Sequence, residues 1–285
     1  MKTIKRLLIV IYILIGFISY SLGIAVYENL KVDQAVRQFK KDMVLKETIT
    51  KGDKMTSYYV PRETKEDEEP SFSDEKRRYV GQPGDILVTR ESPYPYYRGI
   101  HEFVSYYFGG HAALVIENNQ VMEIAGFGSG SIWDVITHDG VSDHDFTQTV
   151  ITVPNYWLDR NHRGESDPAY PYYGSFYRDS FIGLRVKNIT KEEKQLAINE
   201  AKRLEEINTM YNYLFFLDTK NKYYCTDFIS RIYQSINYQR NDKEKLSLND
   251  DGFITSVNDL ILSKDTYIFF YKETIGNHEH IYYFE

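Results

Sequence analysis

The longest apolar stretch of the chain lies close to its N-terminus. Residues 7–27 contain no charged side chain, and 21 residues at the α-helical rise reach about 31 Å, enough to cross the hydrocarbon core of a bilayer. This pattern predicts one transmembrane helix. The pairs Ser21/Gly23 and Gly23/Ala25 leave a cleaved signal peptide as the alternative, although the apolar run exceeds the usual signal core of about 7–15 residues.

Basic residues flank this apolar run on both sides and bear on its orientation in a membrane. Lys2, Lys5 and Arg6 precede it without any acidic residue, and four more basic residues follow it among acidic ones. The immediate flank favours a cytoplasmic N-terminal tail. We therefore predict a single-pass protein of the cell membrane whose bulk lies outside the cytoplasm.

A weaker apolar pattern follows the predicted transmembrane helix. Four apolar residues recur there at spacings of four, three and four: Val32, Val36, Phe39 and Met43. These spacings predict one apolar stripe on a charged helix. The stripe fits either a solvated juxtamembrane helix or a seam for self-association. A self-association seam usually needs about three to four heptads, and only two are present here.

The helix is predicted to pass into a connector. Gly52 and the acidic segment 64–75 are typical of a linker. The chain thus divides into a tail and transmembrane anchor at 1–27, a juxtamembrane helix and charged linker at 28–78, and a folded domain at 79–285.

Short apolar runs alternate with turn residues throughout the third part. Pro83-Gly84-Asp85 forms a turn ahead of a strand, and Asn118-Asn119 tolerates the left-handed conformations of a hairpin turn. The predicted strands lie at 86–88, on both sides of Asn118-Asn119 within 111–126, at 147–153, at 181–186 and at 265–272. Residues 155–179, rich in Tyr, Pro and Gly without a period, indicate a long loop that could cover a site.

Helical signals appear in the second half of this domain. Thr190 and Glu193 form a capping box at the start of a helix predicted to run to Ile207. A second helix carries Cys225 at its start, one turn before an apolar face. Strands mixed with packed helices indicate an α+β fold with an antiparallel sheet.

Cys225 is the only cysteine of the 285 residues, so the chain has no internal disulfide. A lone cysteine is most often a small buried hydrophobic residue. At a helix start, however, backbone N–H groups and the helix dipole favour the reactive thiolate. The same N–H groups could hold the oxyanion of a tetrahedral intermediate.

A nucleophilic cysteine needs a histidine base and a polar group that orients the histidine. His111 follows Gly109-Gly110 and opens an apolar strand, and Glu123 lies on the neighbouring strand. A strict two-residue turn would place them on opposite sheet faces, because it pairs His111 with position 126. We therefore predict an irregular hairpin that brings Glu123 opposite Ala113, with Cys225 beside one ring nitrogen of His111.

Five segments resemble, in order, the permuted papain-like cysteine hydrolases of the YiiX type, which are related to NlpC-type cell-wall peptidases and lecithin retinol acyltransferase. They are PGDILVTR, GGHAALVIE, VMEIAG, YYCTDFISRIY and TSVNDLILS, within residues 83–263. The resemblance implies a permuted papain-like fold with Cys225 as nucleophile, His111 as base and Glu123 as orienting residue. Acyl transfer through a thiolate and an imidazole requires no metal or organic cofactor.

Charge and the other histidines bear on whether the domain binds nucleic acid, anionic lipid or a metal ion. Residues 79–285 carry 19 Lys/Arg against 29 Asp/Glu, a net charge of −10, which disfavours nucleic acid and anionic lipid surfaces as partners of the domain as a whole. The segment 138–145 and the pair His278/His280 lack a known metal-ligand spacing or a full ligand set.

The sequence therefore predicts a membrane-anchored cysteine hydrolase that cleaves an amide bond, with cell-wall peptide as the first substrate class. A lipid ester or amide is the second class, since relatives of one fold share chemistry more than substrate. A non-catalytic binding module, with Cys225 merely buried, is the third alternative. The oligomeric state is left open.

Overall fold

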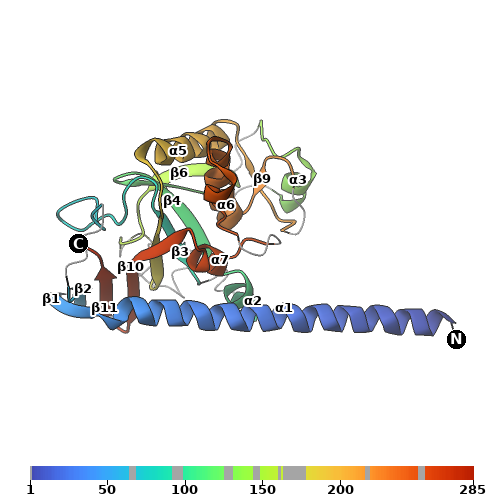
Figure 1. The fold of residues 1–285 in the computed structure, drawn as a ribbon, viewed down its shortest axis with the longest axis horizontal. Helices are drawn as coiled ribbons and strands as arrows, with labels where there is room; N and C mark the ends of the chain where they lie inside the picture. The colour runs from blue at the N-terminus through green and yellow to red at the C-terminus, as the bar shows by residue number, and fades with distance from the viewer. Residues whose placement is uncertain are drawn as a thin grey trace.

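The computed structural model describes residues 2–63, 69–91, 99–124, 131–143, 148–159, 162, 178–215, 219–249 and 254–285. In this part of the chain, helices pack on a large, mostly antiparallel sheet (Figure 1). The α-helices are α1 (Lys2–Lys41), α2 (Ile100–Tyr107), α3 (Ile132–Thr137), α5 (Lys191–Glu206), α6 (Cys225–Gln234) and α7 (Val257–Leu262). Two short 3-10 helices are η1 (Ser235–Gln239) and η2 (Asp242–Glu244).

Nine strands form the main sheet in the order β1-β2-β11-β10-β7-β3-β4-β5-β6. They are β1 (Met43–Lys51), β2 (Lys54–Pro61), β3 (Ile86–Thr89), β4 (His111–Glu117), β5 (Gln120–Ile124), β6 (Val150–Pro154), β7 (Phe181–Val186), β10 (Thr266–Ile275) and β11 (His278–Tyr283). Among the described strand pairs of this sheet, only β2–β11 is parallel. A second sheet pairs β8 (Met210–Tyr211) with β9 (Lys222–Tyr223). The prediction of a mixed fold with an antiparallel sheet and packed helices is confirmed, without the finer family assignment.

Both faces of the central strands are buried. Leu114 and Met122 lie in the core cluster that the sheet forms with α5, α6 and α7. Ala113 and Val121 belong to the opposite cluster, which is built around Trp157 and Phe270. Because successive side chains of a strand point to opposite faces, β4 and β5 contribute to both clusters and are held rigidly in the centre of the domain.

The N-terminal helix α1 is one continuous element of 40 residues, about 60 Å long at the helical rise. It includes a segment long and apolar enough to cross a membrane. Its C-terminal half lies along the base of the domain, while its N-terminal half extends beyond it (Figure 1).

The apolar stripe after the transmembrane segment has neither of its two predicted roles. Val32 is fully buried in the core, Val36 packs against the same cluster, and the rings of Phe39 and Phe284 are 5.3 Å apart. Met43 already begins β1. The stripe therefore packs on the chain's own domain, since apolar side chains next to a core lower the free energy most by joining it.

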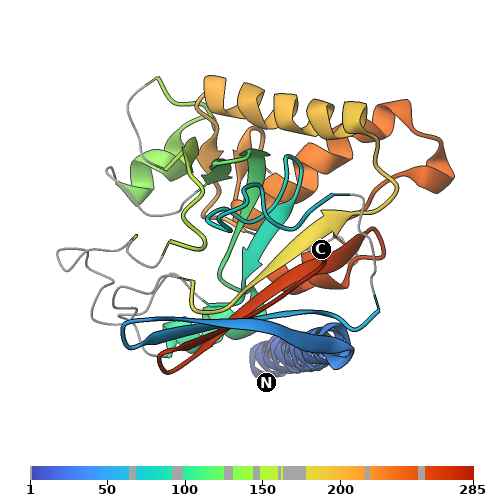
Figure 2. The same ribbon diagram turned by 90° about the vertical axis from the view of Figure 1, so that its left-hand side faces the viewer.

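The predicted linker is wrong for residues 43–61, which form the hairpin β1–β2 with Gly52 in its turn. β2 pairs with β11, so that Met55 lies opposite His278. Figure 2 looks along α1 and shows this hairpin in blue next to the red C-terminal strands. The pairing satisfies backbone groups that an uncovered β11 would expose. Residues 64–68 of the acidic segment lie outside the described residues.

The remaining predicted elements are found close to their expected positions. α5 begins after Thr190, and both hydrogen bonds of its capping box with Glu193 are present. α6 begins at Cys225. β3, β6, β7 and β10 coincide with or overlap the four other predicted strand segments.

Candidate active site

Two glycines position His111 at the start of β4. Gly109 has φ +77°, and a Cβ atom there would lie 2.4 Å from the Cβ of Val257. A Cβ atom at Gly110 would lie 1.5 Å from the carbonyl oxygen of Glu91. No larger residue fits either position without moving the backbone, so the glycine pair allows the close chain crossing from which His111 enters the sheet.

The β4–β5 hairpin is irregular, as the sequence predicts. Glu117 pairs with Gln120 around the two-residue turn, but the register then shifts at a bulge between Val115 and Glu117. Glu123 consequently lies opposite Ala113 and shares a sheet face with His111. Its Oε2 atom is 2.9 Å from Nε2 of His111, and both residues are buried.

Cys225 approaches the same imidazole from α6. The thiol lies close enough to His111 to raise the pKa of the imidazole, and since Nε2 faces Glu123, Nδ1 is the ring nitrogen left for the thiol. Cys225 is partly exposed, unlike His111 and Glu123. The start of α6 is held by Tyr224, whose hydroxyl accepts a 2.7 Å hydrogen bond from the backbone N–H of Thr255.

Charge at His111 is controlled by these two neighbours. Burial by itself lowers the pKa of the imidazole, but the Glu123 carboxylate and Cys225 together raise it to about 10. Burial tends to raise the pKa of Glu123, and His111, Arg178 and Tyr156 lower it below its ordinary value. His111 is therefore positively charged at neutral pH, and this charge lies next to the partly exposed sulfur of Cys225.

Three residues that the sequence analysis did not assign complete the surroundings of Glu123 and His111. Tyr156 donates a 2.9 Å hydrogen bond to Oε2 of Glu123, and Arg178 donates one of 3.1 Å to the Tyr156 hydroxyl. The Trp157 ring is nearly parallel to that of His111, with centroids 6.3 Å apart. These contacts fix the carboxylate and the ring plane.

All three residues belong to the segment 155–179, which was predicted as a loop that could cover a site. Its aromatic start, with Tyr156 next to Trp157, was the available signal. Nothing local linked that start to Glu123, because Arg178 and Tyr156 are 22 positions apart. Residues 160–161 and 163–177 of this segment lie outside the described residues.

The other sequence candidates have different surroundings. Asp85 accepts the backbone N–H of Gln82, as expected of a turn, but it is also fully buried and paired with Arg185 at 2.7 Å. His278 and His280 lie on one side of β11, with Nε2 of His278 at 2.8 Å from Ser57 Oγ.

The described residues contain no group of three or more His, Cys, Asp or Glu side chains that could hold a metal ion. Of the segment 138–145, His144 and Asp145 lie outside those residues.

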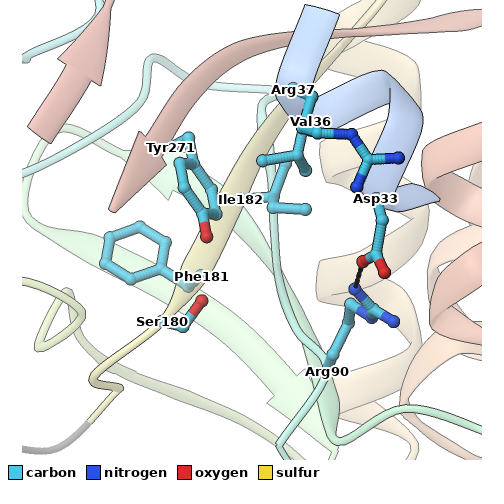
Figure 3. Close-up of a pocket in the computed structure, with 8 residues that line it drawn as sticks. All are labelled: Asp33, Val36, Arg37, Arg90, Ser180, Phe181, Ile182 and Tyr271. Carbon is cyan, nitrogen blue, oxygen red and sulfur yellow. Dashed lines mark hydrogen bonds and ion pairs between the residues drawn. The ribbon is translucent and has the colours of Figure 1, made fainter. Parts of the chain in front are cut away.

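A pocket of about 170 Å³ lies between α1 and the strands β7 and β10 (Figure 3). It is lined by Asp33, Val36, Arg37, Arg90, Ser180, Phe181, Ile182 and Tyr271. Arg90 is paired with Asp33 at 2.6 Å. The pocket contains no nucleophile with an adjacent base, so its lining is that of a packing seam under α1 and not of a reaction site.

The chain matches no protein-family model, and a comparison with curated proteins also finds no match. The resemblance to permuted papain-like hydrolases thus depends on the five quoted segments and remains a proposal.

Proposed function

We propose that the protein is a membrane-anchored cysteine hydrolase with Cys225 as nucleophile, His111 as acid and base, and Glu123 as orienting residue. One observation carries the proposal: a single buried imidazole binds Glu123 through Nε2 while it also interacts with the partly exposed thiol of Cys225. A nucleophile, a base and an orienting group in this order are the arrangement that acyl transfer requires.

The proposed reaction begins with the Cys225 thiolate and the His111 imidazolium. The sulfur attacks the acyl carbon, and backbone N–H groups in the first turn of α6 bind the developing oxyanion. The side chain of Tyr224 makes no capping hydrogen bond to these groups. His111 then gives its proton to the leaving amine, which departs and leaves a thioester on Cys225.

Water completes the cycle. His111, now neutral, removes a proton from a water molecule that attacks the thioester, and the acyl group leaves as a carboxylic acid with the thiolate restored. Glu123 keeps Nε2 protonated throughout and stabilises the positive ring. The residues of the triad need no metal or organic cofactor for these steps.

Anchoring is the second part of the proposal. The apolar segment of α1 would cross the membrane once, with the N-terminal tail in the cytoplasm and the domain outside. For this location a peptide amide of the cell wall is the first substrate class. A lipid ester or amide is the second, and one observation favours it: α1 packs on the domain from Ala25 onward, so no free stalk separates the triad from the membrane.

The test is product analysis with the full-length protein in detergent or nanodiscs. Muropeptides and phospholipids are incubated separately with the wild type and with Cys225→Ala, and the products are read by mass spectrometry. We expect one substrate class to be hydrolysed by the wild type alone. Equal product from both proteins would exclude Cys225 as nucleophile. No product in either class, together with a thiol that iodoacetamide alkylates only after denaturation, would favour the binding-module alternative.

A further inference from the structure

Three exposed aromatic side chains lie on two helices at one end of the domain. On α2, Phe103 is 53% and Tyr106 36% exposed, and on α3, Trp133 is 74% exposed. Along the axis of α1, α2 and α3 lie at the end of the domain from which the N-terminal half of α1 extends, and β1, β2 and β11 lie at the opposite end (Figure 1). α2 lies beside α1, whereas α3 lies farther from it. Large aromatic side chains left in water at one end of a domain indicate a contact surface.

α1 fixes where this end of the domain lies. Asn29 of α1 is buried and donates a 2.8 Å hydrogen bond from Nδ2 to the carbonyl oxygen of Tyr106. Arg90 binds Asp33 of α1 at 2.6 Å, and Lys40 binds Glu273 at the same distance. These contacts extend from Asn29 to Lys40, about three turns of α1, so the domain cannot swing about the helix as it could on a flexible stalk.

The contacts place α2 at the level where the apolar run of α1 ends. That run ends at Tyr27, two residues before Asn29, and Ala25 inside the run is itself buried. α2 therefore lies at the depth where a transmembrane helix leaves the hydrocarbon for the polar headgroups. Aromatic side chains are enriched at this depth because their rings are apolar and their edges polar.

α3 is held in a defined position at the same end. Nζ of Lys222 on β9 donates hydrogen bonds to the carbonyl oxygens of Val135 and Ile136, at 2.9 and 3.0 Å. Val135 is fully buried, so the helix has a packed side, and Trp133 projects from its exposed side. Two separately anchored helices thus carry exposed aromatic side chains at the same end of the domain.

We propose that Phe103, Tyr106 and Trp133 form a docking surface that seats the domain on the bilayer that α1 crosses. The inference depends on the proposed membrane anchor but not on the proposed chemistry. A bilayer is the occupant because α2 packs on α1 at the level where the apolar run of α1 ends. The net charge of −10 on residues 79–285 makes zwitterionic lipid the better partner, since the contact is aromatic and gains nothing from anionic headgroups.

Docking would place the triad next to the membrane surface. Only Phe108, Gly109 and Gly110 separate α2 from His111. The rings of Phe108 and Phe215 stack with centroids 6.1 Å apart, and Phe215 in turn contacts Tyr224 at 5.2 Å, the residue that precedes Cys225. The acyl groups within reach of Cys225 would accordingly be those close to the plane of the membrane.

Tryptophan fluorescence of the full-length protein in phosphatidylcholine nanodiscs tests the surface. The chain has two tryptophans, and Trp157 is fully buried. The emission lost in Trp133→Phe therefore reports position 133. Replacing unmodified lipid by lipid brominated in its acyl chains should quench most of the Trp133 emission. A tryptophan introduced as Phe103→Trp in the Trp133→Phe background should be quenched as well.

Two further reporters make the result decisive. Ile49→Trp in the Trp133→Phe background places a tryptophan at an exposed position of β1, at the opposite end of the domain, and should not be quenched. Phe17→Trp in the same background lies in the apolar run of α1 and should be quenched if the anchor is correct.

Quenching at position 17 without quenching at 133 and 103 would overturn the docking surface and leave the anchor standing. Absence of quenching at position 17 would overturn the anchor, and the inference with it. Trp133 shielded from both brominated lipid and aqueous acrylamide would show a protein contact and would also overturn the inference.

Discussion

Two buried ionic pairs in this domain differ in what surrounds them. Asp85 and Arg185 form a closed pair: two guanidinium nitrogens meet the two carboxylate oxygens at 2.8 and 2.7 Å, and a third binds the carbonyl oxygen of Glu69. His111 and Glu123 share one hydrogen bond of 2.9 Å, and the other side of the imidazole faces Cys225. In the first pair, both carboxylate oxygens of Asp85 are bound by the guanidinium of Arg185. In the second pair, the imidazole can exchange a proton with a reacting group.

The Asp85–Arg185 pair therefore has a structural role, whereas the contacts of the His111–Glu123 pair suit a chemical role. A bidentate pair is satisfied internally and holds the β3 and β7 strands in place. In the His111–Glu123 pair, one ring nitrogen of His111 stays available to the Cys225 thiol. The charged imidazole can therefore act on a partly exposed sulfur atom. Four changes test whether the two pairs are as different as their contacts indicate.

The largest effect is expected for Cys225→Ala. Removing the nucleophile should reduce turnover by at least about a thousandfold, because only binding and the oxyanion site remain. The melting temperature should change little, since Cys225 is partly exposed and the substitution keeps a small apolar side chain. The rate of product formation and a thermal denaturation curve are the two measurements. A large drop in melting temperature with unchanged turnover would give Cys225 a structural role.

Asp85→Ala should have the opposite profile. It leaves the guanidinium of Arg185 buried without its carboxylate, at a cost of about 3–5 kcal/mol in the free energy of unfolding. The turnover of the folded fraction should be preserved. Denaturant titration measures the loss, with Asp242→Ala as the matched control. Asp242 pairs with Lys245 at the surface, so that control should leave the denaturation midpoint nearly unchanged.

Glu123→Gln should lower turnover by about a hundredfold, because the ring loses the charge that orients and stabilises the imidazolium. The hydrogen bond to Nε2 can still form through the amide oxygen, so the fold should survive. Turnover is measured with the substrate class that the product analysis identifies. It is compared with the turnover of Tyr156→Phe, which removes one hydrogen bond to Glu123 but keeps the carboxylate. A Glu123→Gln enzyme as active as the wild type would remove Glu123 from the proposed mechanism.

The smallest expected effect is a change with pH in the stability difference between the wild type and Glu123→Gln. The pKa of His111 is raised from 6.5 to about 10 in the folded protein. Its charged interactions therefore contribute fully below the unfolded pKa and are lost as the pH rises through the folded pKa. The stability advantage of the wild type over Glu123→Gln should shrink between pH 6.5 and pH 10. Unfolding curves at a series of pH values measure it, and a difference independent of pH would contradict the charged imidazolium.

Local patterns sufficed for much of the domain. The capping box of α5, the glycine pair before β4 and the start of α6 at Cys225 each depend on residues a few positions apart. The β4–β5 register followed from one further condition, that Glu123 and His111 share a sheet face, because a shift of one residue moves every side chain to the other face. The pairing of Glu123 with Ala113 confirms it.

Tertiary structure alone decided the rest. The hairpin β1–β2 was mistaken for a linker because its partner β11 lies more than 200 positions away, with Met55 opposite His278. Likewise, Tyr156 and Arg178 reach Glu123 only in the folded domain, and the stripe on α1 had no visible partner. Caps, turns and periodicity arise from interactions between near neighbours and are written in short segments. A contact between distant segments instead depends on how the whole chain buries its apolar surface and satisfies its backbone hydrogen bonds.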